Sequence, residues 1–281
     1  MKKHIFKEWL SAARPWSIPA SAMPVIATLA YLFWKGVEIN WLYGVVAMIG
    51  MIFFHLAGNT WTNNLEQKKG DKLENSVGTK WLSIALCVAG LACCGYLIAM
   101  TGTTLLWIAL AGAAFTLVYP WMRYTIFGDL DIIVTFAILP AIATSFAAVG
   151  NIDWSVLIIA LPVGLITAGI QHCRNARILI AGNKTALTAV SLGTNVSARL
   201  FWTEMVFPFV WVGISSMLGF MPLYTVLIFL TIAIALACGT TMIKSVGQGT
   251  LLLSDLDVRT ANLQRTFSTL LTIGLILGKF L

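Results

Sequence analysis

The sequence predicts an all-α polytopic membrane protein, with nine transmembrane helices in a single domain over residues 1–281. The first observation is composition: 59% of the residues are hydrophobic and only 10% are charged, whereas about 25% of the residues of a soluble domain are charged. The second is that apolar runs near 20 residues, the length that crosses about 30 Å of hydrocarbon, recur along the chain. The third is an uneven distribution of basic residues among the connections.

Nine apolar runs define the predicted spans. They lie at residues 17–34, 41–60, 81–101, 104–120, 130–149, 154–173, 200–220, 223–243 and 266–281. The first follows a basic start that lacks a short apolar stretch with a small-residue cleavage site, so we expect it to remain as a span. The connections on one side are short and only reverse the chain. The connections on the other side are longer, polar and partly helical in pattern, at 61–80, 121–129, 174–199 and 244–265. We expect the functional residues there.

The basic residues predict the orientation. With the N-terminus in the cytoplasm and the C-terminus opposite, only Lys35 and Lys279 of the eighteen basic residues fall outside. The sixteen on the cytoplasmic side are Lys2, Lys3, Lys7, Arg14, Lys68, Lys69, Lys72, Lys80, Arg123, Arg174, Arg177, Lys184, Arg199, Lys244, Arg259 and Arg265. We therefore expect a multi-pass protein of the cell membrane, in contact with the lipid bilayer.

Composition and motifs also exclude several functions. The net charge of +7 does not indicate nucleic-acid binding, because membrane insertion and anionic lipid headgroups explain the basic residues. The chain has no standard glycine-rich phosphate loop and no serine nucleophile elbow. An unrelated transporter is disfavoured, since no internal repeat relates the two halves. The cysteines fall within or at the ends of spans, and we expect neither a disulfide nor a structural metal.

A polar stripe marks the end of the second span. His55, Asn59, Asn63 and Glu66 follow one another at intervals of four, four and three, which places them on one face of a helix. Polar side chains at the end of a membrane helix are costly unless they pair, line a wet cavity or bind a ligand. The stripe is therefore a site hypothesis; the alternative is a helix end that meets water.

A second polar stretch follows the sixth span, from Gly169 to Gly193. His172 and Asn175 are three residues apart, and Arg174 and Lys184 follow without an acidic residue in the stretch. Arginine offers a planar fork that matches phosphate oxygens and lysine adds a point charge, so the pattern favours anion binding. For Arg177 and Arg199 the alternative is a topology signal alone. His55 and His172 could each be structural histidines.

Motifs along nearly the whole chain carry a family resemblance. They comprise Arg14 with Pro15, Pro19 and Pro24 near the start; Asn59, Lys69 and Gly70 in the first polar stretch; Asp131 of the GDLD sequence at 128–131; and Arg174, Lys184, Thr185 and Gly193 in the second stretch. With these motifs the chain resembles the UbiA superfamily of intramembrane prenyltransferases. Within it, the chain is similar to the 1,4-dihydroxy-2-naphthoate prenyltransferases of menaquinone biosynthesis.

The resemblance implies a UbiA-like bundle whose cytoplasmic polar loops cap a central cavity. It implies transfer of an isoprenyl group from a polyprenyl diphosphate to a small aromatic, naphthoate-like acceptor, with Mg²⁺ as cofactor. Carried over by position, the catalytic residues are Asn59, Asn63, Glu66 and Asp131. The metal positions are Asn59, Asn63, Glu66 and Asp71, and the substrate-binding residues are Arg14, Arg174, Lys184, His55, His172 and Asn175.

The family's metal positions have lost carboxylates in this chain. Asn63 and Glu66 each replace an Asp in the first motif, and Asn175 and Leu179 do so in the second. An amide oxygen can bind Mg²⁺ but brings no charge. One interpretation is a working prenyltransferase whose cations do part of the metal's work. Another is an inactive protein that binds or carries an isoprenoid lipid or acts as a partner subunit. A third is a different metal or proton site formed by the two histidines with Asn59 and Asn175.

Overall fold

The computed structural model describes residues 9–67, 76–122, 125–180, 193–248 and 250–281. Within these ranges the regular structure is entirely helical, which confirms the predicted all-α class. The elements are η1 (Pro15–Ser17), α2 (Pro19–Trp34), α3 (Trp41–Gln67), α4 (Ser76–Thr101), α5 (Thr104–Met122), α6 (Ile126–Ile133), η2 (Val134–Ile138), α7 (Leu139–Val149), η3 (Trp154–Val156), α8 (Leu157–Ile180), α9 (Thr194–Met217), η5 (Leu223–Thr231), α10 (Ile232–Gln248), η6 (Thr250–Leu253) and α11 (Leu256–Phe280).

Seven helices in the described ranges are long and apolar enough to cross a membrane. The predicted fourth span coincides with α5, which is apolar over the shorter range Thr104–Tyr119. The predicted ninth span falls within α11. Both runs are helical, and their crossing of the membrane stays a prediction.

Helix ends extend further than hydropathy predicted. α8 continues to Ile180 and α9 begins at Thr194, so much of the expected polar connection at 174–199 is helix. α11 likewise begins at Leu256 rather than at residue 266. The difference arises because hydropathy detects only the part of a helix that can lie in hydrocarbon, whereas backbone hydrogen bonding continues past it.

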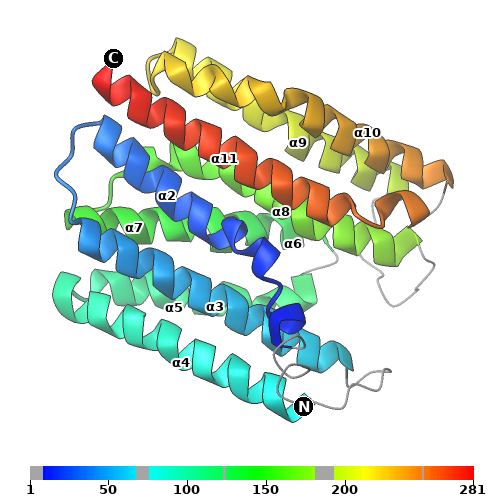
Figure 1. The fold of residues 1–281 in the computed structure, drawn as a ribbon, viewed down its shortest axis with the longest axis horizontal. Helices are drawn as coiled ribbons and strands as arrows, with labels where there is room; N and C mark the ends of the chain where they lie inside the picture. Colours follow the sequence, from blue (N-terminus) through cyan, green and yellow to red (C-terminus); the bar gives the residue numbers. More distant parts are fainter. Residues whose placement is uncertain (1–8, 68–75, 123–124, 181–192, 249) are drawn as a thin grey trace.

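The bundle has a buried centre and a lipid-facing exterior. α2 and α8 are the most enclosed spans, and α4 is the least enclosed. α11 packs on α2 and α8, while α3 packs on α4 at the outside of the bundle (Figure 1). The largest fully buried side chains include three phenylalanines, Phe201, Phe209 and Phe267. Because lipid tails are as apolar as these side chains, close packing rather than the hydrophobic effect holds such helices together.

One end of the bundle collects the polar helix ends. α3, α5, α8 and α10 end there, and α4, α6, α9 and α11 begin there, on the right of Figure 1. We call it the polar end. The opposite end has short turns such as the one at Gly102, whose φ of 101° favours glycine. At that opposite end Lys35 Nζ lies 2.5 Å from Asp153 Oδ2.

Two local features position side chains near the polar end. α6 and α7 are joined by the π-helical turn η2, which carries Phe136; such turns are often found at functional sites. Gly169 in α8 lets α9 approach closely, because a Cβ atom there would lie 2.4 Å from Met205 Cε and 3.3 Å from Phe201. This contact lies one helical turn before His172.

Candidate functional site

The first polar cluster joins η1 to α3. Ser17 Oγ lies 2.9 Å from His55 Nε2, and Asn59 Nδ2 donates to Ser17 Oγ at 3.0 Å and to the Ala13 carbonyl at 3.1 Å. The rings of His55 and of Phe136 in η2 lie nearly perpendicular to each other, with centroids 5.3 Å apart. His55 and Asn59 therefore lie on one face, as their spacing predicted, and they bind the segment before α2.

The backbone of η1 is held in an uncommon conformation. Arg14, which precedes Pro15, has φ 50° and ψ 60° in the left-handed region. A residue other than glycine adopts this region at a cost of order 1 kcal/mol, and such residues cluster at functional sites. The carbonyl of Arg14 accepts hydrogen bonds from the backbone N–H of Ser17 and from Ser17 Oγ. The turn therefore places Trp16 and Ser17 toward two different helices.

Arg174 of α8 connects η1 to α11. Its guanidinium carbon lies 5.2 Å from the centre of the Trp16 ring, and its Nε donates to Asp257 Oδ2 at 3.2 Å. The absence of an acid from its own stretch predicts an unpaired Arg174, and that prediction is wrong. Its acid comes from α11, 83 residues later. Arg177, by contrast, is exposed and donates to the Ser254 carbonyl at 3.3 Å.

A second, buried cluster joins α6, α8 and α9. His172 Nδ1 lies 3.1 Å from Asp129 Oδ2 and 3.2 Å from each carboxylate oxygen of Glu204. His172 Nε2 lies 2.8 Å from Ser197 Oγ. His172 is 4% exposed and Glu204 is 3% exposed. One ligand atom from each of the three ionisable residues lies within 4.8 Å of the others, a separation that a metal ion can bridge.

The other predicted site residues are placed differently. Asp131 is buried and accepts a hydrogen bond from Thr135 Oγ1 at 3.3 Å, on its own helix segment. Asn175 Oδ1 accepts from Gln171 Nε2 at 3.4 Å. Asn63 and Glu66 lie in the last turns of α3, as their spacing predicted, but their side chains are outside the described part of the chain. Asp71 and Lys184 lie outside the described residues altogether, so their predicted roles stay predictions.

Asp129 and Glu204 are not among the site residues predicted from the sequence. A signal was present for both: Asp129 lies two residues before Asp131 in the same GDLD motif, and Glu204 is an acid inside a membrane span. Ionisable residues within spans are rare and usually functional. Reading each span for isolated charges would have found Glu204.

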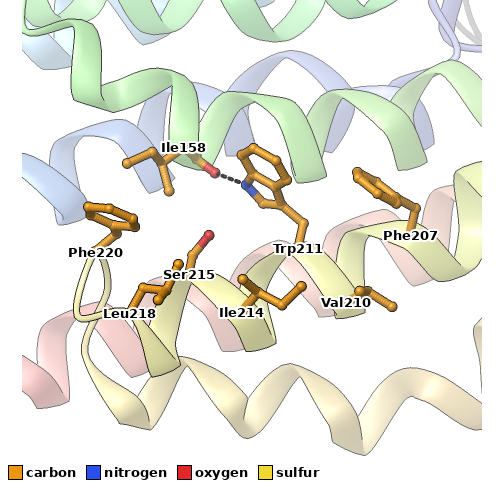
Figure 2. Close-up of a pocket in the computed structure, with 8 residues that line it drawn as sticks. All are labelled: Ile158, Phe207, Val210, Trp211, Ile214, Ser215, Leu218 and Phe220. Carbon is orange, nitrogen blue, oxygen red and sulfur yellow. Dashed lines mark hydrogen bonds between the residues drawn. The ribbon is translucent and has the colours of Figure 1, made fainter.

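The pocket shown in Figure 2 lies away from both clusters. It has a volume of about 380 Å³ and is lined by apolar residues where α8 begins and α9 ends, opposite the polar end. Trp211 Nε1 donates across it to the Ile158 carbonyl at 2.9 Å (Figure 2). This pocket is not the expected cavity under the polar loops, and that cavity stays a prediction.

A protein-family model and several curated proteins match this chain. The model of the UbiA prenyltransferase family matches residues 21–248. Curated relatives carry the name UbiA prenyltransferase domain-containing protein 1. That of Mus musculus is 27% identical over 230 residues, which is 74% of this chain and 68% of the relative. That of Xenopus tropicalis is 25% identical over 203 residues, 66% of this chain. The chain spans 59% of the Xenopus tropicalis protein and 65% of that of Rattus norvegicus.

A solved structure shares the fold. It comes from work on digeranylgeranylglyceryl phosphate synthase in membranes and superposes with a TM-score of 0.58. The superposition covers 98% of this chain and 99% of the other at 16% sequence identity. At that identity the likeness concerns the arrangement of helices.

Proposed function

Because the chain belongs to the UbiA prenyltransferase family, whose model matches residues 21–248, we propose that it is an integral membrane prenyltransferase. It would transfer an isoprenyl group from an allylic diphosphate to a small acceptor at the polar end of the bundle. The observation that carries the proposal is the convergence of η1, α3 and α8 on one set of residues, to which α11 is bonded through Asp257. These residues, Trp16, Ser17, His55, Asn59 and Arg174, are called the polar-end site below.

Arg174 is the proposed diphosphate-binding residue. The Trp16 ring and Asp257 hold its guanidinium from two sides, so little side-chain freedom remains to be lost on binding. Its Nε bonds Asp257, and Nε is only one of the guanidinium's N–H donors. A fixed cation stabilises the negative charge that grows on the diphosphate as the carbon to oxygen bond breaks.

The remaining residues of the polar-end site have supporting roles. Ser17 Oγ donates its one proton to the Arg14 carbonyl, so His55 Nε2 donates to Ser17 Oγ and His55 Nδ1 is the nitrogen with a free lone pair. We assign His55 the role of base toward the acceptor through Nδ1. Asn59 positions η1 through its two donated hydrogen bonds. The rings of Trp16 and Phe136 offer π faces near the site, which suit both an allylic cation and an aromatic acceptor.

Binding of Mg²⁺ is a separate part of the proposal, and it does not follow from the residues of the polar-end site. The described residues at the family's motif positions, Asn59 and Asn175, offer neutral amides, and the Asn59 amide nitrogen is engaged by η1. By themselves they do not fit Mg²⁺, which prefers carboxylate oxygens. A magnesium ion would therefore depend on Glu66 and Asp71. No step of the mechanism above is assigned to it.

A naphthoate-like acceptor and a place in menaquinone biosynthesis are the finer parts of the proposal. The motif resemblance at Arg14, Asp131 and the 184–193 stretch supports them. The competing proposal is an inactive protein that binds or carries an isoprenoid. The replacement of family aspartates in both motifs, at Asn63 and Glu66 and at Asn175 and Leu179, favours it.

One experiment separates these proposals. Purified protein is titrated with a non-hydrolysable geranylgeranyl diphosphate analogue in the presence of Mg²⁺, of Mn²⁺ and of a chelator, and turnover is then assayed with hydroxylated naphthoates. We expect saturable binding and, with a suitable acceptor, formation of a prenylated product. Binding without turnover for every acceptor would support the carrier, and absence of binding in all three conditions would contradict both.

A further inference from the structure

We propose that Asp129, His172 and Glu204 form a binding site for a small divalent transition cation of the Zn²⁺ type, separate from the polar-end site. We call these three residues the buried triad. The inference goes beyond prenyl transfer, and metal binding can be measured without any turnover. The metal site can therefore be disproved without affecting the proposed function, and the proposed function can be disproved without affecting the metal site.

The triad has more carboxylate oxygens than hydrogen-bond donors, and this imbalance points to a cation. Three carboxylate oxygens, Asp129 Oδ2 and both oxygens of Glu204, lie 3.1 to 3.2 Å from the single atom His172 Nδ1. That nitrogen carries at most one N–H and can satisfy only one of them well. Glu204 Oε2 is fully buried and has no hydrogen-bond partner among the residues that the structure describes. A cation among these atoms would engage the carboxylates that one proton cannot.

The distances suit a metal ion. Zinc binds imidazole nitrogen at about 2.0–2.1 Å and carboxylate oxygen at about 2.0–2.2 Å, so neighbouring ligand atoms around it are about 3.0–3.4 Å apart. The nitrogen to oxygen distances of 3.1 and 3.2 Å in the triad fall within this range. The imidazole favours Zn²⁺, Fe²⁺ or Ni²⁺ over Mg²⁺, which prefers oxygen ligands only.

Charge balance supports the same conclusion. Two carboxylates and an imidazolium would leave one negative charge buried between membrane helices, which is costly unless a further proton or a metal cation neutralises it. Two carboxylates, a neutral imidazole and a divalent cation sum to zero. Ser197 supplies the matching outer contact: its Oγ lies 2.8 Å from His172 Nε2 and can accept the Nε2 proton. In that tautomer the lone pair of Nδ1 is free to bind a metal. In known metal sites a hydrogen bond from the other ring nitrogen fixes the tautomer in the same way.

The triad is distinct from the polar-end site in its elements and its positions. It joins α6, α8 and α9, whereas Arg174, two residues after His172 in α8, contacts η1 and α11. None of its three residues occupies a position to which the family resemblance carried a metal ligand. Gly169, one turn earlier in α8, leaves room for the side chains of Met205 and Phe201 of α9 beside the triad.

The first test is a titration of tag-free, chelator-treated protein with Co²⁺, followed by visible absorption. We expect one Co²⁺ per chain with the intense bands of a low-coordinate site, full displacement by Zn²⁺, and no displacement by about a thousandfold excess of Mg²⁺. Zn²⁺ should also raise the melting temperature, since a ligand that binds only the folded state stabilises it. A spectrum of hydrated Co²⁺ throughout the titration would overturn the proposal and leave the triad as an internal ion pair.

Substitutions locate the bound ion. His172→Gln, Glu204→Gln and Asp129→Asn should each weaken Co²⁺ binding by more than about a hundredfold, and Ser197→Ala by about tenfold or more. The matched controls, His55→Gln and Asp257→Asn, remove a histidine and an acid that lie outside the triad and should leave binding unchanged. Binding that survives all three triad substitutions, or that is lost equally in the controls, would place the ion elsewhere and refute the assignment. The wild-type spectrum decides the question if a triad variant does not fold.

Discussion

At the scale of single residues, the polar end depends on pairs formed between distant segments. Arg174 is held by Trp16 through a cation–π contact and by Asp257 through a charge-assisted hydrogen bond. Such contacts are worth about 1 to 3 kcal/mol each where water is excluded. Asp257 is only 8% exposed, so its carboxylate requires the guanidinium. The same pairing keeps Arg174 in the orientation that a diphosphate would meet.

The first prediction concerns Arg174. Arg174→Ala should raise the Kd of the diphosphate analogue at least about tenfold, because a charge-assisted contact of about 1.5 kcal/mol or more is lost. Arg174→Lys should restore only part of the affinity, since an ammonium cannot reproduce the planar fork. Isothermal titration with the analogue measures both. The double variant Arg174→Ala with Asp257→Asn avoids an unpaired buried carboxylate. Arg199→Ala, an exposed arginine of α9, is the control, and equal Kd values for all variants would refute the assignment.

The second prediction concerns the pair of Lys35 and Asp153 at the opposite end. Burial of Asp153 favours its neutral form, but hydrogen bonds from Lys35 and Ser155 and the Lys35 charge outweigh burial and lower its pKa below the ordinary 3.8. A carboxyl group with a lowered folded pKa adds stability above its ordinary pKa and loses that contribution as the pH falls through the lowered value.

Asp153→Asn should therefore lower the melting temperature by about 1 to 3 °C at pH 7, the usual worth of one partly exposed ion pair. The difference from wild type should persist to about pH 5 and shrink as the pH falls below about 4. Thermal unfolding in detergent across this range measures it. Asp255→Asn, at an exposed acid, should show no such pattern, and a pH-independent difference for Asp153→Asn would contradict the ion-pair account.

At the scale of elements, small residues determine how closely helices pack. Gly274 in α11 faces η5, where a Cβ atom would lie 2.5 Å from the Tyr224 carbonyl oxygen and 2.6 Å from Thr225 Cα. These are backbone atoms, which cannot move aside as the end of a side chain can. Close approach of this kind is the usual basis of helix association in membranes. α11 is thus packed into the bundle although it is the least apolar of the long helices.

Gly274→Ala should therefore destabilise the protein by about 1 to 3 kcal/mol, the usual cost of overpacking. That corresponds to a fall of about 3 to 10 °C in melting temperature. Differential scanning fluorimetry in detergent is the measurement. The matched control is Gly95→Ala in α4, where a Cβ atom would meet nothing within 4 Å. An equal effect of the two substitutions would mean that helix propensity, not packing, determines the outcome.

At the scale of the whole molecule, the helix directions place alternate connections at opposite ends (Figure 1). Arg174, Arg177 and Lys244 lie in the last turns of helices that end at the polar end, whereas Lys35 and Lys279 lie at the other end. Positive charge of this kind is retained on the cytoplasmic side during insertion. The polar-end site and the buried triad would then both lie in the cytoplasmic half of the bundle.

Cysteine labelling tests this orientation. In a cysteine-free parent, Asn151→Cys should react with an impermeant maleimide on intact bacterial cells, because residue 151 is exposed at the end opposite the polar end. Lys244→Cys, exposed at the polar end, should react only after permeabilisation. The reverse pattern would invert the orientation, and equal labelling of both on intact cells would contradict the alternation of helices.

Much of the fold could be predicted from the sequence because its causes are local. A run of apolar residues must form a helix to satisfy its backbone hydrogen bonds in lipid. Each predicted span is accordingly helical over most of its length, although 130–149 is divided among α6, η2 and α7, and 223–243 between η5 and α10. The stripe through His55 and Asn59 followed from helical spacing alone. The connection at 174–199 is partly helical, as its pattern predicted, because helices continue beyond hydrocarbon. The GDLD motif around Asp129 and the span around Glu204 do not indicate that both residues contact His172, because these contacts join different helices.

The sequence by itself determined the membrane class, the helices, the order of the polar stretches and the family resemblance, since periodicity, length and motifs are properties of neighbouring residues. Only the tertiary structure decided that Arg174 pairs with Asp257, that Ser17 contacts His55, and that Glu204 and Asp129 converge on His172. Those partners are tens of residues apart along the chain. Which of them meet depends on how closely and at what rotation whole helices pack, and that is fixed by contacts such as the one at Gly169.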